Sequence, residues 1–323
     1  MTAGIEAVAG GVLDGDRRSI ARAITEVERG GSVATGLLKQ IYHRSGRAFL
    51  VGVTGSPGVG KSTLVDRLVS ALRAQRRTVG VLAVDPTSPF SGGAVLGDRV
   101  RMQEHAGDSG VFVRSMATRG QLGGLARATS DAGIVLDAGG YDWIVIETVG
   151  VGQAEIEVWQ ATDMTIVVTM PGSGDGVQAL KAGVMEIADL FVVNKADHDG
   201  ADRAVAEIET MLGLGEHGAH EWMPPILQTR AVDGHGIESV VETVERFRAE
   251  AGERAAHRRL RRVQARLRMA VSEGFLDYAE HKALEPGRFE QLVEEVASGD
   301  TDPYTAAERL LRLTITSEGT VKP

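Results

Sequence analysis

The stretch GSPGVGKST, residues 55–63, constrains this chain more than any other, because it fits G-x-x-x-x-G-K-[ST] between an apolar run and an amphipathic run. In such a loop the glycines let backbone N–H groups turn inward around a phosphate, and the following helix adds its positive end. Lys61 is expected to bridge the β- and γ-phosphates, and Ser62 to ligate Mg²⁺. The residues predicted to bind nucleotide here are Gly55, Ser56, Pro57, Gly58, Val59, Gly60, Lys61, Ser62 and Thr63. The sequence therefore predicts a nucleoside-triphosphate site.

Short apolar runs alternate with amphipathic segments through the middle of the chain. The runs cover residues 49–54, 78–84, 111–115, 143–148, 164–170 and 190–195. Each is too apolar to be half-exposed, as expected of parallel strands that helices cover on both faces. The alternation predicts an α/β fold of the P-loop NTPase type, with a doubly wound, mostly parallel sheet and helical extensions at both ends.

A helical pattern precedes the α/β region. Residues 16–29 carry four apolar side chains at helical spacing, and Asp16 stands where an N-cap is expected. These side chains are Ile20, Ala23, Ile24 and Val27. We expect an N-terminal helical extension over residues 1–45 and a nucleotide-binding domain over residues 46–250.

The strand signal disappears after about residue 250, where an arginine-rich helical pattern begins. Its apolar positions recur every three or four residues, at Leu260, Val263, Leu267 and Val271. Two interpretations remain open, a packing helix with a solvated basic face and an arm that binds a partner or a second copy. Asp302 as cap and Pro303 in the first turn predict a last helix. The C-terminal helical extension is expected over residues 251–323.

The tetrapeptide NKAD at residues 194–197 predicts which base is bound, because it closes an apolar run in the order expected of a GTPase. The Asp197 carboxylate can accept hydrogen bonds from the ring N–H and the exocyclic amine of guanine, while the Lys195 stem lies along the ring. Adenine lacks this donor pair and would leave the carboxylate without partners. Asn194, Lys195 and Asp197 are therefore predicted to select GTP.

Carboxylates near strand ends are candidate Mg²⁺ ligands. Glu147 ends an apolar run, and Gly150 follows where a backbone N–H senses the γ-phosphate in P-loop proteins. Asp85 ends another run, and Asp98 lies in a glycine-bounded loop that looks like a switch segment. The predicted metal ligands are Ser62, Asp85, Asp98 and Glu147.

Hydrolysis is the least complete part of the predicted site. The water-orienting Gln that often follows the switch glycine is replaced by Val151, and Gln153 stands two residues further on. The predicted catalytic residues are Lys61, Asp85, Asp98, Glu147 and Gln153. We expect intrinsic turnover to be slow and a partner to complete the site.

Composition removes several classes of function. The chain has 35 basic and 44 acidic residues, and its net charge of −9 has the wrong sign for a protein that coats nucleic acid. It contains no cysteine, which excludes thiolate metal ligands and a cysteine nucleophile. No apolar run approaches the ~20 residues needed to span a bilayer. We expect a cytoplasmic protein that binds neither nucleic acid nor membrane.

Four stretches together resemble the MeaB/ArgK family of P-loop GTPases. They are GRAFLVGVTGSPGVGKSTLVDRL, VDPTSPFSGGAVLGDRVRM, ETVGVGQAE and NKAD. The resemblance continues through DRRSIARAITEVE near the start and DPYTAAERLL near the end, so it covers nearly the whole chain. Glu in place of Asp at position 147 is typical of the wider class of metallochaperone-like GTPases that includes this family.

The resemblance implies a GTPase that acts as a chaperone for adenosylcobalamin-dependent methylmalonyl-CoA mutase, gating cofactor loading and protecting the mutase from inactivation. Members of the family hydrolyse GTP faster when bound to the mutase, and they are usually homodimers formed through the C-terminal arm. By similarity, Lys61, Asp85, Asp98 and Glu147 match active-site positions. Asp175 and Lys181 lie in the segment PGSGDGVQALKAG, which matches a switch that couples nucleotide state to the mutase.

The sequence departs from the family pattern in two places, the switch segment and the base loop. Gly176 replaces an acidic residue of the switch segment, and Gln228-Thr229-Arg230-Ala231 replaces the usual T-S-A base loop. A backbone N–H of Ala231 or Val232 is still expected to meet the guanine carbonyl oxygen, so Arg230, Ala231 and Val232 complete the predicted nucleotide-binding set.

Three alternatives to the main prediction remain open. A metal-delivery GTPase of the same wider class is disfavoured because the chain has no cysteine and its histidines lack ligand-like spacing. A kinase is disfavoured because no acceptor site or catalytic base is evident. The third is a nucleotide-dependent binding module whose GTP hydrolysis is incidental. It differs from the main prediction because a partner would not raise its rate of GTP hydrolysis.

Overall fold

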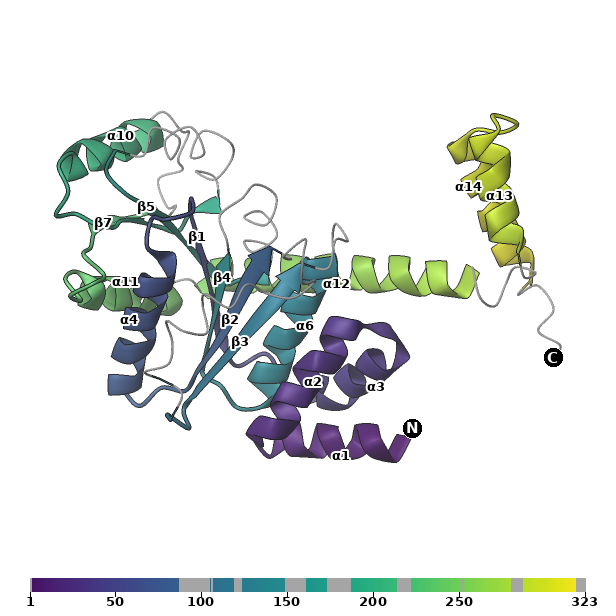
Figure 1. Cartoon of the computed structure of the whole chain (residues 1–323), viewed down its shortest axis with the longest axis horizontal. Coiled ribbons are helices and arrows are strands. Elements are labelled where there is room, and N and C mark those ends of the chain that lie inside the picture. Colours follow the sequence, from purple (N-terminus) through teal and green to yellow (C-terminus); the bar gives the residue numbers. More distant parts are fainter. Residues whose placement is uncertain are drawn as a thin grey trace. The chain divides into compact units, whose positions relative to one another are not determined.

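A seven-stranded parallel sheet forms the centre of the protein in a computed structural model (Figure 1). The structure describes residues 2–86, 105, 107–118, 124–148, 161–172, 187–213, 222–250, 252–279 and 287–317. The strands are β1 (Phe49–Thr54), β2 (Val79–Pro86), β3 (Val111–Thr118), β4 (Trp143–Thr148), β5 (Met164–Thr169), β6 (Leu190–Val193) and β7 (Ile226–Gln228). Their order is β3-β2-β4-β1-β5-β6-β7, and each neighbouring pair is parallel. The predicted α/β fold with a parallel sheet is confirmed.

Helices cover both faces of this sheet (Figure 1). On one face, α4 (Lys61–Ala74) and α11 (Ile237–Glu250) share a core with the strands. On the other lie α6 (Gly124–Ala138) and the N-terminal helices α1 (Thr2–Leu13), α2 (Arg17–Arg29) and α3 (Gly31–Ile41), followed by a short 3-10 helix, Tyr42–Arg44. The helix α10 (Ala201–Gly213) packs against β5 and β6 through a third cluster. The sheet is therefore doubly wound.

Alternating side chains of each strand divide between the two cores. In β4, Val145 packs in the core with α4 and α11, whereas Ile144 and Ile146 pack in the core with α6. Every residue of β1, β4, β5 and β6 is buried, because both faces of these strands are covered. This explains why the strands read as continuous apolar runs.

The N-terminal extension follows its sequence pattern in α2 and departs from it in α1. The Asp16 carboxylate caps α2 by accepting from the Ser19 N–H at 2.8 Å, and the four predicted apolar side chains are buried. The helix α1 lies within the expected helical extension, residues 1–45, but no helical pattern marks it in the sequence, and its three glycines disfavour helix formation. Val8 and Val12 on α1 are buried in the α6 core, and this packing outweighs the low propensity.

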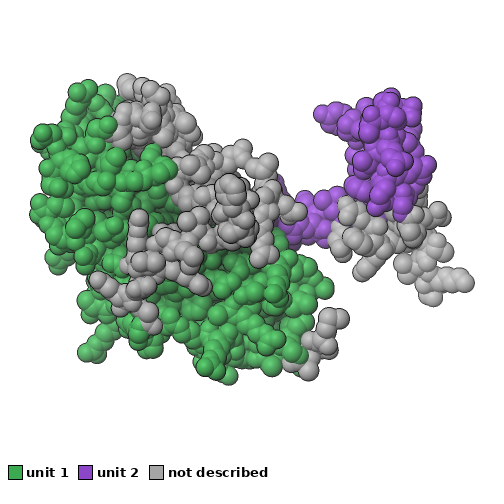
Figure 2. Space-filling view, viewed as in Figure 1, with its two compact units in different colours: residues 1–262 green, residues 263–323 purple. Residues whose placement is uncertain are grey.

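The chain divides into two compact units, residues 1–262 and 263–323 (Figure 2). The helix α12 (Gly252–Tyr278) begins in the first unit and continues into the second. Within the second unit, α13 (Arg288–Ala297) and α14 (Pro303–Ser317) pack around a small apolar cluster. None of the helices in the described ranges is long and apolar enough to cross a lipid bilayer.

The start of α14 agrees with its sequence signal. The Asp302 carboxylate accepts from the N–H groups of Tyr304 and Thr305, both at 3.0 Å, and from the Thr305 hydroxyl at 2.6 Å. The Thr305 hydroxyl and N–H hold the pKa of Asp302 below its ordinary value, because they stabilise the ionised carboxylate. Asp302 is the predicted N-cap, and Pro303 occupies the first helical turn.

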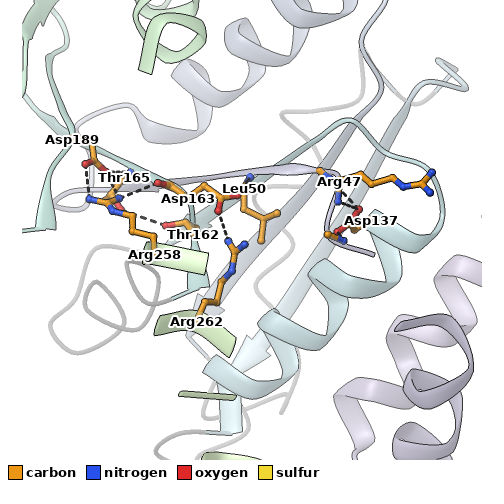
Figure 3. A network of polar contacts seen from close by, with 11 residues as sticks. Arg47, Leu50, Asp137, Thr162, Asp163, Thr165, Asp189, Arg258 and Arg262 are labelled. Carbon is orange, nitrogen blue, oxygen red and sulfur yellow. Dashed lines mark hydrogen bonds and ion pairs between the residues drawn. The ribbon is translucent and has the colours of Figure 1, made fainter. Parts of the chain in front are cut away.

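Two arginines of α12 face the sheet, contrary to the interpretation of a uniformly solvated basic face (Figure 3). Arg258 donates through both terminal nitrogens to the Asp189 carboxylate, at 2.5 and 2.6 Å. Arg262 pairs with Asp163 at 2.8 Å. The Asp189 side chain is 3 % exposed and that of Arg258 18 %, so the first pair is largely shielded from water.

The same two aspartates also tie neighbouring strands together at the amino edge of the sheet (Figure 3). Asp163 directly precedes β5 and accepts from the Leu50 N–H of β1 at 2.9 Å. Asp189 directly precedes β6 and accepts from the Thr165 N–H of β5 at 2.8 Å. Each carboxylate therefore joins a strand start to an arginine of α12.

We expect Asp189→Ala to lower the free energy of unfolding by about 3 kcal/mol, the usual cost of breaking a buried ion pair from one side. The variant removes the acceptor of the Thr165 N–H and both carboxylate contacts of Arg258, which keeps its hydrogen bond to the Asp163 carbonyl at 3.0 Å and its contact with the Phe247 ring. Urea denaturation would measure the change. Glu207→Ala is the control, because its partner Arg203 is 84 % exposed and such surface pairs contribute ~0.5 kcal/mol. Equal losses in the two variants would contradict the importance of the Asp189 pair.

Candidate nucleotide site

The loop 55–60 connects β1 to α4 at the carboxyl edge of the sheet. The strand β1 lies between β4 and β5, near the centre of the strand order. In open parallel sheets, ligands bind outside the carboxyl ends of the strands where the strand order reverses. The fold therefore places the glycine-rich loop where an α/β protein of this type binds its ligand.

Two glycines of this loop have no room for a side chain. Gly55 has φ +140°, and a Cβ there would lie 2.0 Å from the Val168 carbonyl oxygen. Gly60 has φ +97°, and its Cβ would lie 2.4 Å from Nδ2 of Asn194. The left-handed backbone and the close approaches explain why glycine stands at both positions.

Lys61 begins α4 and folds back over the loop. Its side chain is largely buried, and Nζ donates to the carbonyl oxygens of Gly55 at 2.7 Å and Ser56 at 3.0 Å. The ammonium group is thereby held within the curve of the loop, beside the amino end of the helix. Positive charge from the ammonium and from the helix end converges there, as a phosphate site requires.

Ser62 and Glu147 lie in direct contact next to this loop. The Ser62 hydroxyl donates to Oε1 of Glu147 at 2.6 Å, and Glu147 is buried near the end of β4. The neighbouring hydroxyls of Thr148 and Thr54 are hydrogen-bonded at 3.0 Å. Hydroxyl and carboxylate oxygens are hard ligands of the kind that Mg²⁺ prefers, so this donor pair fits the metal.

Asn194 joins three segments that are far apart in the sequence. Its Nδ2 donates to the Val59 carbonyl at 2.8 Å. Its Oδ1 accepts from the Thr229 hydroxyl at 3.1 Å and from the Ala231 N–H at 3.0 Å. Lys195, with φ +57°, donates from Nζ to the Gly58 carbonyl at 2.8 Å. The structure thus brings the NKAD motif, the glycine-rich loop and the predicted base loop together.

The Asp197 side chain is exposed beyond the end of β6. Within the part of the chain that the structure describes, its carboxylate accepts no hydrogen bond. The base loop was predicted to offer the N–H of Ala231 or Val232 to a ligand. The Ala231 N–H donates to Asn194, so the Val232 N–H is the one that remains. The Val232 side chain is 74 % exposed.

Arg230 is held in the turn that follows β7. Its Nε lies 2.5 Å from Oδ2 of Asp233, and its backbone pairs with His235 as an antiparallel bridge. Desolvation acts to raise the pKa of Asp233, but the His235 N–H and Arg230 outweigh it and hold that pKa below its ordinary value. The Arg230 side chain is thus engaged within its own turn.

Several predicted site residues lie outside the described part of the chain. They are Asp98, Gly150, Gln153, Asp175, Gly176 and Lys181. The backbone of Asp85 lies within β2, paired with Ala117 of β3, and its side chain is also outside the described part. The functions predicted for these residues stay predictions.

Arg67 is a neighbour of the site that the sequence motifs do not include. It lies on α4 and donates to the carbonyl oxygens of Ala231 and Val232. In the sequence it stands in the stretch GRAFLVGVTGSPGVGKSTLVDRL, on the helix that starts with Lys61, but nothing local indicates which loop it would meet.

The comparison with known families decides the classification. A family model described as methylmalonyl-CoA mutase-associated GTPase MeaB matches residues 20–283. The chain belongs to the MeaB family. A protein named as a GTPase in Pyrococcus abyssi is 47 % identical over 302 residues, which cover 92 % of this chain and 93 % of that protein.

Two further relatives of this MeaB-family protein extend the comparison. The mouse mitochondrial methylmalonic aciduria type A homolog is 36 % identical over 327 residues, covering 94 % of this chain and 77 % of that protein. The crystal structure of a LAO/AO transport system kinase superposes with a TM-score of 0.70 at 26 % identity, covering 97 % of this chain and 98 % of that one. With the P-loop NTPase fold and relatives named as GTPases, this MeaB-family protein is a GTPase.

Proposed function

We propose that this GTPase acts as a chaperone for adenosylcobalamin-dependent methylmalonyl-CoA mutase, gating cofactor loading and protecting the mutase from inactivation. The match of residues 20–283 to a family described as mutase-associated carries the proposal. The likeness to a protein named for methylmalonic aciduria supports it, since that name points to the same metabolism. GTP binding and hydrolysis would then time the action on the mutase.

In this proposal the loop 55–63 holds the phosphates of GTP. Its backbone N–H groups and the amino end of α4 contribute fixed positive charge, and Lys61 reaches the β- and γ-phosphates. Its contacts to the carbonyls of Gly55 and Ser56 keep the ammonium group oriented before the nucleotide arrives. This orientation lowers the cost of ordering the side chain on binding.

Ser62 and Glu147 would hold Mg²⁺ together with Asp85 and Asp98. The hydrogen bond of 2.6 Å between Ser62 and Glu147 supports their part in this set, because it already places two hard oxygen donors side by side. When bound, Mg²⁺ neutralises charge that develops on the phosphates during transfer. The Gly150 N–H would sense the γ-phosphate.

The guanine base would be recognised by residues that follow β6 and β7. Asp197 accepts from the ring N–H and the exocyclic amine, and the Lys195 stem packs along the ring. The Val232 N–H meets the guanine carbonyl oxygen, since Asn194 engages that of Ala231. Arg230 would contribute through the shape of this loop and its pairing with Asp233.

The coupling between the bound nucleotide and the mutase would depend on segments near the γ-phosphate. Val151 stands in the place of a water-orienting Gln, so Gln153 or a residue of the mutase would complete the catalytic site. Asp175 and Lys181 would transmit the nucleotide state to the mutase.

We also propose that the protein is a homodimer formed through the C-terminal helical arm, residues 251–323. The apolar stripe of α12 supports this, because Leu260, Leu267 and Val271 are 65 %, 63 % and 61 % exposed. An apolar helix face of this kind favours contact with a partner over contact with water.

The test of the mutase proposal is a binding measurement with methylmalonyl-CoA mutase from the same organism. Analytical ultracentrifugation would compare complexes formed with a non-hydrolysable GTP analogue and with GDP. We expect a specific complex whose affinity differs between the two nucleotides by about tenfold, a typical size for allosteric coupling. Failure to bind in either state, or binding only to a different cobalamin-dependent mutase, would contradict the proposed client.

A further inference from the structure

Arg67 holds two consecutive carbonyl groups of the base loop. It is a half-buried residue of α4, and its Nε donates to the Ala231 carbonyl at 3.2 Å. One terminal nitrogen donates to the Val232 carbonyl at 2.8 Å. The forked guanidinium supplies both donors from one rigid plane, so it restrains the two peptide groups relative to each other.

These contacts fix the direction in which the next N–H groups point. The described peptide bonds are all trans, and in a trans peptide the C=O and N–H of one plane point in opposite directions. Because the Ala231 carbonyl points toward Arg67 on α4, the Val232 N–H points away from that helix. No described group accepts a hydrogen bond from this N–H.

Asn194 restrains the other side of the same loop. It accepts from the Thr229 hydroxyl and from the Ala231 N–H, and it donates to Val59 in the glycine-rich loop. The segment 229–232 is thus held between a residue of the NKAD motif and a residue of α4. Asn194 engages the Ala231 N–H, which leaves the Val232 N–H to face a base. The orientation of that N–H depends on Arg67, because Arg67 holds the carbonyl of the same peptide plane.

We propose that Arg67 is a positioning residue for guanine recognition, which orients the Val232 N–H toward the carbonyl oxygen at position 6 of the base. This inference rests on the proposed guanine site. Since Arg67 and Lys61 lie on the same helix, α4 carries both a phosphate ligand and the support for a base contact. Arg67 acts through the loop and does not touch the nucleotide itself.

The test compares nucleotides that differ at position 6 or at position 2 of the base. IDP keeps the oxygen at position 6 and lacks the exocyclic amine that Asp197 would read. 6-Thio-GDP keeps the amine and replaces the oxygen by sulfur, which accepts hydrogen bonds weakly. Displacement of a fluorescent GDP analogue would give the dissociation constant of each nucleotide for the wild-type protein and its variants.

We expect Arg67→Met to weaken GDP and IDP binding by about tenfold each, the size of one net hydrogen bond, and to change 6-thio-GDP binding little. The preference for GDP over 6-thio-GDP therefore shrinks, while the preference for GDP over IDP is kept. Arg67→Lys retains the charge but has a single donor nitrogen, which cannot reproduce the fork, so its preference should lie between those of wild type and Arg67→Met.

Arg73→Met is the matched control on the same helix. Arg73 makes two hydrogen bonds to the Asp108 carboxylate, at 2.8 and 2.9 Å, and one to the Arg77 carbonyl at 2.6 Å. Its loss should lower thermal stability and leave the preference among the three nucleotides unchanged. If lower stability alone altered the preference among the nucleotides, Arg73→Met and Arg67→Met would both show the change.

Equal weakening of all three nucleotides by Arg67→Met would overturn the inference, because Arg67 would then support the loop without orienting a base contact. The Asp197→Asn variant separates this failure from a failure of the guanine site. If Asp197→Asn reduces the preference for GDP over IDP while Arg67→Met changes no preference, only the Arg67 inference fails. If neither variant alters any preference, the proposed guanine site fails as well.

Discussion

Asp197→Asn is expected to weaken GTP binding by about a hundredfold and to make xanthosine triphosphate the preferred nucleotide. The carboxylate accepts from two donors of guanine, whereas an amide places its own N–H group against one of them. Xanthine carries a carbonyl oxygen at position 2, and that oxygen can accept from the amide. Competition between GTP and xanthosine triphosphate for the same fluorescent nucleotide would measure the change.

Asp199→Asn is the matched control, because Asp199 is an exposed carboxylate in the same turn, two residues further on. It removes the same charge from the same region and should leave the preference for GTP intact. An Asp197→Asn protein that still prefers GTP as strongly as wild type would show that the base is recognised elsewhere.

Lys61→Ala is expected to lower GTP turnover by about a hundredfold at saturating nucleotide, because it removes the ammonium group held against the Gly55 and Ser56 carbonyls of the phosphate loop. Phosphate release over several turnovers would measure the rate. Lys39→Ala, which removes an exposed lysine from α3, should leave the rate unchanged. Retained hydrolysis in Lys61→Ala, with a thermal unfolding curve like that of wild type, would contradict the assignment of the phosphate site.

The central strands could be predicted closely from the sequence. The predicted bounds 49–54 and 143–148 agree with β1 and β4, because strands buried on both faces form uninterrupted apolar runs. The three-residue strand β7 was missed, since so short a run gives no periodic signal. The bounds of α1 within the expected helical extension could not be predicted, because its glycines oppose helix formation and its stability comes from packing against the α6 core.

The two arginines of α12 that face the sheet could not be distinguished in the sequence from the exposed ones. Arg258 and Arg262 belong to a pattern that resembles a solvated basic face, and the sequence does not reveal that Asp189 and Asp163 lie within reach. Those aspartates directly precede strands, and each is separated from its arginine by 69 residues or more along the chain. The charges come together only when the strands pair into the sheet and α12 packs beside their starts.

In the candidate nucleotide site, too, contiguous motifs could be predicted from the sequence and contacts between distant segments could not. The glycine-rich loop and NKAD could be found because their residues are contiguous and their chemistry requires fixed spacing. Asn194 holding Thr229, and Arg67 holding Ala231, are contacts between distant segments and leave no local pattern. Which base-loop N–H remains for a ligand could be decided only from the structure, where Asn194 engages that of Ala231.

The proposed action on the mutase is best tested by the rate of GTP hydrolysis in its presence. Phosphate release would be measured with increasing methylmalonyl-CoA mutase from the same organism, up to saturation. We expect the rate to rise about tenfold or more, the size of a modest catalytic contribution, because the partner completes a site that has Val151 in place of a water-orienting Gln. The same titration with Lys61→Ala should give no rise. A wild-type rate that stays unchanged at saturating mutase would show that the mutase does not complete the catalytic site.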